Sequence, residues 1–342
     1  MPPGGPNPAQ QGGNEPDYAF IRSAVNPPLE TVRTTFGYEI VSYFLDDPAA
    51  IADEQMLHMY EHLRRIGHQE TIGLWMNSRG GATETPLKVV SLFREFADRF
   101  VVILPYRAHS SATLIALGAD EIVMTAMSEL GPIDPSRRHP LLPTEDGPGG
   151  KKIPIPISVQ DLRHLLSFLE RELGEDLSPD AASQVYTALF DKVHPLAIGA
   201  LEQSWALAQQ IGAQILSTRL DPSSKADEIK SMVERLSDHY KSHLYQISRT
   251  EARTIGLPVR DATDDETEAA WNLYDAYSHL QVGGEALVNG KKASVGRLGH
   301  IDSHAGTSIG IGMTQVAAPT NQAITWRSSW VLGPGGRPLA GP

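Results

Sequence analysis

The sequence predicts an α/β fold built on a parallel β-sheet, on three observations from the first part of the chain. Short runs of β-branched and aromatic residues, at 38–45, 71–76, 100–104 and 121–124, have the length of buried strands. Segments with apolar residues at helical spacing lie between these runs. Strands and helices also alternate, which implies right-handed crossovers and a parallel sheet covered on both faces.

The helix signals in this region are specific. Segment 53–66 carries Met56, Tyr60 and Leu63 on one helical face, which we predict to be buried, and Gly67 suits the C-terminal cap. A second helix is predicted from its N-terminal cap and first-turn proline, Thr85-Pro86. A third, made of small residues, is predicted at 111–118, ahead of the fourth strand.

The second half of the chain is predicted to be mostly helical. Residues 136–156 hold many prolines and glycines and are predicted to form a long exposed loop. Helical patterns then follow at 158–169, 179–246, 249–256 and 264–280, and short strands or loops from Gly283 onward.

Composition limits the function. The formal charge of -12 argues against a general nucleic-acid binder, and the absence of cysteine excludes thiol catalysis, thiolate metal sites and disulfides. We expect no membrane span, because charged and polar residues interrupt the longest apolar stretch. Residues 1–16 are predicted to be a disordered tail and not a signal peptide, and residues 333–342 a loose tail. The protein is predicted to be cytoplasmic.

Two junctions between a strand and a helix carry residues suited to acyl chemistry. In LWMNSRGGAT (74–83), two glycines follow a strand, at the end of the sheet where open α/β proteins bind ligands. A tight turn without a functional role is the plainer interpretation of these glycines. In PYRAHSSATLIALGADEIVM (105–124), Ser110 and Ser111 begin a helix, whose free amides can stabilise an oxyanion.

These motifs, with LGPIDP, DKVHPLAIG and ISRTEARTIGLPV further along, resemble the Clp-type peptidase and crotonase superfamily. Within it the chain is most similar to the serine dehydrogenase proteinase family, relatives of ClpP and signal peptide peptidase A. The resemblance implies a Clp/crotonase-like parallel sheet with repeated ββα/βαβ units. It also implies a serine peptidase domain over 33–260, followed by an extension at 261–332 that packs on the core or on an oligomer interface.

The resemblance also implies roles for individual residues. Ser110 takes the position of the nucleophile, and the amides of Gly80 and Ser111, with Gly81 beside them, take that of the oxyanion hole. The family order of serine, aspartate and histidine suggests Asp134 and His194 as the rest of a triad. Asp134 in a turn and His194 at a helix boundary are the alternatives.

A Ser-Lys dyad, as in relatives of signal peptide peptidase A, would instead recruit Lys151 or Lys152 from the long loop, where solvated lysines are the plainer interpretation. The departure from the family pattern is the turn around His109, which leaves open which serine attacks.

The function expected from this resemblance is an endopeptidase that forms an acyl-enzyme on Ser110 and uses no cofactor. Its substrate would be a peptide or protein, and the chain would assemble with itself into a trimer or a larger ring. Two alternatives stay open. One is a crotonase-like enzyme that binds coenzyme A and polarises a thioester with the same amides. The other is a non-catalytic scaffold of the Clp fold.

Two histidine patterns resemble metal sites, and we predict that neither binds metal. His58 and His62 match H-x-x-E-H, yet on a helix both point away from the predicted buried face and should be solvated. His300, Asp302 and His304 would share one side of an extended strand, where ordinary polar residues are the simpler interpretation.

Overall fold

The computed structural model describes most of the chain. The described residues are 18–45, 47, 49–137, 139–147, 152–173, 179–280, 283–288, 291–315 and 318–330. The predictions for the tails at 1–16 and 333–342, and for Lys151, fall outside them.

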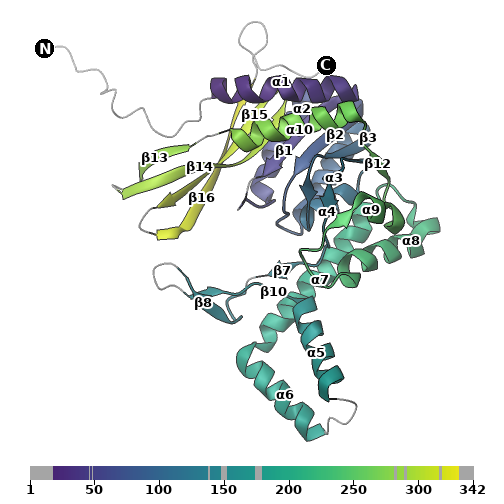
Figure 1. The fold of residues 1–342 in the computed structure, drawn as a ribbon, viewed down its shortest axis with the longest axis vertical. Coiled ribbons are helices and arrows are strands. Elements are labelled where there is room, and N and C mark those ends of the chain that lie inside the picture. The colour runs from purple at the N-terminus through teal and green to yellow at the C-terminus, as the bar shows by residue number, and fades with distance from the viewer. Residues whose placement is uncertain are drawn as a thin grey trace, which may run out of the picture.

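Five parallel strands form the body of the main sheet, in the order β12, β5, β3, β2, β1 (Figure 1). Their bounds are β1 (Glu39–Leu45), β2 (Gln69–Asn77), β3 (Ala97–Leu104), β5 (Glu121–Met124) and β12 (Val259–Asp261). The first four are the strands expected from the apolar runs, and every neighbouring pair among the five is parallel. The predicted α/β fold is confirmed.

Helices cover both faces of this sheet, as its apolar strands require. Along β1, Val41 and Tyr43 face one hydrophobic core, and Ile40 and Phe44 face the other. Helices that pack into the first core are α2 (Met56–Ile66), α3 (Thr85–Phe96), α4 (Ser111–Leu117), α7 (Pro195–Leu216) and α8 (Pro222–Glu234). The second core lies beneath α1 (Tyr18–Phe36) and α10 (Asp264–His279), which run side by side.

Helix α1 is not among the elements predicted from the sequence. Its interior contains Pro27 and Pro28, which remove backbone donors and normally argue against a helix. The helix forms because one of its faces is buried. The buried side chains on this face are Ile21, Val25, Leu29 and Val32. Burial of these four side chains against α10 and the sheet outweighs the local preference.

The C-terminal part of the chain makes the sheet mixed. Strand β14 (Lys291–Ser303) pairs antiparallel with β1, placing His300 opposite Phe44. The sheet then continues through β15 (Gly306–Gln315) and β16 (Ala318–Trp330), while β13 (Gly283–Val288) also pairs with β14. The Gly, Ser, Thr and β-branched residues of this region predicted short strands or loops. Strands do form, but they are not short, since β14 and β16 each have 13 residues and β15 has 10.

The middle of the chain leaves the body of the molecule. Helices α5 (Val159–Leu173) and α6 (Pro179–Lys192) project away from the sheet (Figure 1). The predicted loop contains three short strands, β7 (Ser136–Arg137), β8 (Thr144–Asp146) and β9 (Lys152–Pro154), and β10 (Ile157–Ser158) follows it. None of the helices in the described ranges is both long and apolar enough to cross a membrane.

The prediction for α2 was wrong for two side chains. Tyr60 is 40% exposed, whereas His62 is completely buried. The His62 ring lies 2.7 Å from the hydroxyl of Ser303 and 3.1 Å from that of Ser308. Strands β14 and β15 bring both serines over this side of the helix, which sequence analysis expected to be solvated. Burial lowers the pKa of His62 to about 3, so the ring is neutral.

His62→Ala is therefore expected to lower the free energy of unfolding by roughly 1–3 kcal/mol, since it removes two buried hydrogen bonds and leaves a cavity. Urea denaturation measures this. His68→Ala, which removes a largely exposed imidazole just after the C-cap of the same helix, is the control and should change stability by less than about 0.5 kcal/mol. Equal stability of the two variants would contradict the structural role of His62.

His300, Asp302 and His304 do not form one group. His300 and Asp302 are buried, with the His300 Nδ1 atom 3.4 Å from the carboxylate of Asp302. Tyr277 of α10 donates a hydrogen bond of 2.6 Å to the same carboxylate. His304 lies beyond the end of β14 and pairs with Glu39 at 2.7 Å. The buried residues Tyr277, His300 and Asp302 therefore link α10 to the C-terminal strands.

Candidate active site

Both predicted loops lie at the carboxyl end of the parallel strands. The backbone between β2 and α3 turns at Gly80, whose φ of 99° favours glycine. A Cβ atom on Gly80 would lie 2.6 Å from the carbonyl oxygen of His109 and 2.9 Å from the Cβ atom of Ser110. Glycine at this position lets the loop approach the serine turn closely.

Ser110 has an unusual backbone conformation. Its φ is 52° and its ψ is -117°, and it is the one residue other than glycine with positive φ among the described residues. Such a conformation costs on the order of 1–3 kcal/mol and persists only where the surroundings impose it. Ser110 is the N-cap of α4 but makes no capping hydrogen bond through its side chain. Ser110 lines a pocket of about 580 Å³.

A small three-stranded sheet brings three distant segments to this pocket. Strand β4 (Arg107–Ala108) pairs with β6 (Glu129–Leu130), which pairs with β11 (Ile247–Ser248). Ser110 follows β4, Asp134 follows β6, and His243 precedes β11. The pairing of these strands thus gathers a serine, an aspartate and a histidine in one region.

His243 lines the Ser110 pocket and is held by Asp134. The His243 Nδ1 atom lies 3.0 Å from the Asp134 Oδ1 atom; the aspartate side chain is 6% exposed and the histidine 33%. The hydrogen bond that the imidazole donates to Asp134 raises the pKa of His243 above its ordinary value of 6.5. With Nδ1 engaged by the carboxylate, Nε2 is the ring atom left for a substrate or a serine hydroxyl.

The amide of Gly80, predicted as an oxyanion donor, already has a partner. It donates to the hydroxyl of Ser78 at 3.0 Å. The carbonyl of Gly80 accepts from Ile51 at 2.9 Å, which fixes the peptide that carries the Gly81 amide. The Ser111 hydroxyl in turn donates to the Gly81 carbonyl at 2.8 Å. The amides of Gly81 and Ser111 make no hydrogen bond to any described residue.

A second imidazole adjoins Ser110 but does not line its pocket. The His109 Nε2 atom lies 2.9 Å from the carboxyl of Glu129, and both side chains are only 13% exposed. Burial lowers the pKa of His109 to about 4 and raises that of Glu129. His109 is therefore neutral near pH 7 and a weak proton acceptor.

The other predicted bases lie elsewhere. His194 is exposed at the N-cap of α7, where its Nδ1 atom accepts a hydrogen bond of 3.1 Å from the Leu196 amide. It is not among the residues that line the Ser110 pocket. Lys152 is exposed on the β8–β9 hairpin and pairs with Asp146 at 2.7 Å. His243 was not considered in the sequence analysis; in the structure it pairs with Asp134 and lines the same pocket as Ser110.

The sequence held one signal for His243. The residue lies just before ISRTEARTIGLPV, a stretch that contributes to the family resemblance, and it keeps the order serine, aspartate, histidine. His194 also satisfies that order and lies within another matching stretch. Order alone could not separate the two histidines.

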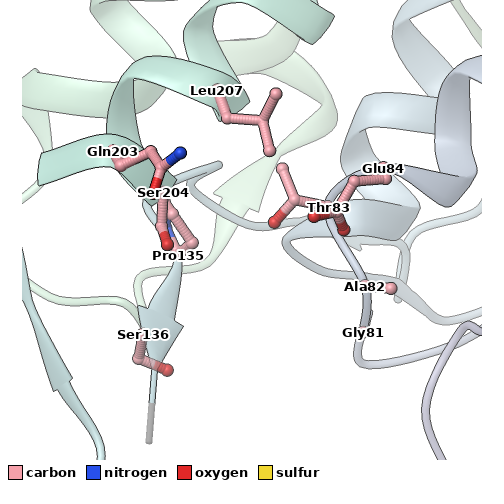
Figure 2. A pocket seen from close by; sticks show the side chains of 9 residues that line it. All are labelled: Gly81, Ala82, Thr83, Glu84, Pro135, Ser136, Gln203, Ser204 and Leu207. Atoms are coloured by element: carbon pink, nitrogen blue, oxygen red, sulfur yellow. The ribbon is translucent and has the colours of Figure 1, made fainter. Parts of the chain in front are cut away.

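A second pocket, of about 450 Å³, adjoins the first. The two share Gly81, Thr83, Pro135 and Ser136, so together they form one continuous depression. Figure 2 shows Thr83 and Glu84 on one side of the second pocket and residues of α7 on the other. Within the described part of the chain, no three His, Asp or Glu side chains are grouped so that they could hold a metal ion.

Comparison with curated sequences finds two relatives, and no family model matches the chain. Both are uncharacterized proteins of Methanocaldococcus jannaschii. One is 24% identical over 145 residues, which is 39% of this chain and 50% of that protein. The other is 33% identical over 73 residues, 21% of this chain and 26% of that protein. The chain thus matches half or less of the length of these relatives.

Several solved structures show a distant likeness. The ClpP protease catalytic domain of Plasmodium falciparum is 15% identical with a TM-score of 0.33, covering 67% of this chain and 89% of that one. A membrane-bound stomatin-specific protease is 12% identical with a TM-score of 0.33, covering 67% and 79%. A probable enoyl-CoA hydratase/isomerase of Mycobacterium abscessus is 15% identical with a TM-score of 0.30, covering 70% of each chain.

Proposed function

We propose that this protein is a serine hydrolase, and specifically a peptidase, with Ser110 as nucleophile, His243 as general base and Asp134 as the residue that orients the histidine. One observation carries the proposal: the strained Ser110 turn shares a pocket with a histidine that is held 3.0 Å from a buried aspartate. Nucleophile, base and orienting carboxylate are the three groups that acyl transfer by serine requires.

In this mechanism the Ser110 oxygen attacks the carbonyl carbon of the substrate while Nε2 of His243 takes the hydroxyl proton. The imidazolium that results is stabilised by Asp134 and then donates the proton to the leaving amine. Water, activated by the same histidine, attacks the acyl-enzyme and releases the second product.

The amides of Gly81 and Ser111 are the proposed oxyanion donors. Both are free of hydrogen bonds to the described residues, whereas the Gly80 amide is engaged by Ser78. The Ser111 hydroxyl, through its bond to the Gly81 carbonyl, joins the two loops that supply these amides. Such preorganised donors stabilise the charge that develops on the carbonyl oxygen.

The His243–Asp134 pair favours hydrolysis over the crotonase-like alternative. Polarising a thioester requires only the two amides and would leave Ser110, His243 and Asp134 without a role. Assembly into a trimer or a larger ring, with a peptide or protein as substrate, remains part of this proposal.

The pH dependence of Ser110 reactivity tests the assignment of the base. His243 accepts a proton only when neutral, and Asp134 raises its pKa. The rate of fluorophosphonate labelling is therefore expected to rise with pH, with a midpoint above 6.5. Asp134→Asn removes the charge that stabilises the imidazolium, so its midpoint should move to lower pH and its maximal rate should fall.

Glu129→Gln is the matched control, because it changes the carboxyl group beside the other nearby imidazole, His109. Its midpoint should equal that of the wild type. A midpoint that moves with Glu129→Gln and not with Asp134→Asn would assign the base to His109 instead.

A further inference from the structure

The second pocket offers a site for a substrate side chain beside the scissile bond. It adjoins the Ser110 pocket through the Gly81–Thr83 segment and Pro135-Ser136. Gly81 supplies one of the proposed oxyanion amides, so a peptide whose carbonyl reaches Ser110 has a neighbouring residue within reach of this space. The volume of about 450 Å³ suffices for a long side chain.

The residues that line the second pocket are mostly polar, with one apolar side chain among the larger ones. Thr83, Ser136 and Gln203 make no side-chain hydrogen bond to any residue in the described ranges, so these groups are available to a ligand. Leu207 adds a partly buried apolar surface from α7. Figure 2 places Leu207 across the pocket from Thr83.

Glu84 gives the pocket its charge. It is the one ionisable residue among those that line the second pocket, and no described basic side chain pairs with it. In the neighbouring Ser110 pocket, by contrast, Arg79 pairs with Asp47 at 2.9 Å, and Asp47 also pairs with Arg107 at 3.1 Å. Among the described residues, the second pocket therefore carries one negative charge that has no ion-pair partner, on a protein whose formal net charge is -12.

We infer that this second pocket binds a lysine or arginine side chain of the substrate, and that the enzyme cleaves next to a basic residue. This inference rests on the proposed peptidase function. The aliphatic stem of the basic side chain lies against Leu207, while its cationic end meets the carboxylate of Glu84 and the neutral polar groups of Thr83, Ser136 and Gln203.

Peptide binding tests the pocket without requiring catalysis. In the Ser110→Ala background, a blocked alanine hexapeptide with one central lysine is compared by calorimetry with the same peptide carrying norleucine. We expect the lysine peptide to bind about tenfold more tightly, and the difference to shrink as salt is added. Glu84→Gln should abolish the difference. Glu95→Gln, an equal charge change at the other end of α3, should preserve it.

Cleavage-site profiling on a mixed peptide library then places the pocket relative to the scissile bond. Lysine or arginine should be enriched at one fixed position next to the cut, and Glu84→Gln should remove this enrichment while Ser110 still reacts with a fluorophosphonate. Equal affinity for the lysine and norleucine peptides, or an equal loss in Glu84→Gln and Glu95→Gln, would overturn the inference. If the protein binds the lysine peptide more tightly but Ser110 is not labelled, the proposed binding of a basic side chain in the second pocket would stand and the proposed peptidase function would be rejected.

Discussion

Ser110→Ala is expected to abolish both fluorophosphonate labelling and peptide hydrolysis, a loss of at least about 10⁴-fold in kcat/KM. The reason is that no other described hydroxyl combines a strained turn at a helix start with the pocket that His243 lines. One adduct per chain, mapped to Ser110 by mass spectrometry, is the expected result for the wild type. Alanine is no larger than serine, so the fold should be retained.

A second substitution separates chemistry from strain. Ser110→Gly removes the same hydroxyl but adopts the positive φ of this turn without the penalty of a Cβ atom. It should be inactive and yet raise the free energy of unfolding by about 1 kcal/mol, as measured by urea denaturation. An adduct found on Ser111, or hydrolysis by purified Ser110→Ala, would reject the assignment.

His243→Ala is expected to lower turnover by roughly 10²–10⁴-fold, because the serine loses its proton acceptor. Labelling by the fluorophosphonate should slow to a similar degree. His243 is partly exposed, so the variant should fold, and its circular dichroism spectrum checks this.

His194→Ala is the matched control. It removes the N-cap of α7, which should lower stability by about 1 kcal/mol, and should leave kcat/KM within about twofold of the wild type. If instead His194→Ala is inactive and His243→Ala is active, the triad first suggested by the family order would be restored, and the proposed base would be wrong.

The elements of the first part of the chain follow directly from the sequence. Strand β5 has the predicted bounds, and α4 begins at the predicted Ser111. Each of these elements carries its own apolar pattern and its own caps, so local information suffices. The same patterns place Gly80 and Ser110 at the carboxyl ends of neighbouring strands, which is why their proximity could be expected.

Elements that depend on distant partners could not be predicted in this way. Helix α1 forms in spite of Pro27 and Pro28, because α10 and the sheet bury its apolar face. His62 is buried because β14 and β15 cover a face of α2 that looks solvated in the sequence. In both cases the deciding contact comes from a segment more than two hundred residues away.

The sequence by itself determined the α/β core, the glycine loop and the serine turn, since each depends on contiguous residues. Only the tertiary structure decided which of the two histidines, His194 or His243, lines the pocket of Ser110. His243 and Asp134 are 109 positions apart, and the strands β4, β6 and β11 that bring their segments to Ser110 are each only two residues long. Strands that short have no recognisable pattern of their own, because their pairing is stabilised by the surrounding packing and not by local preference.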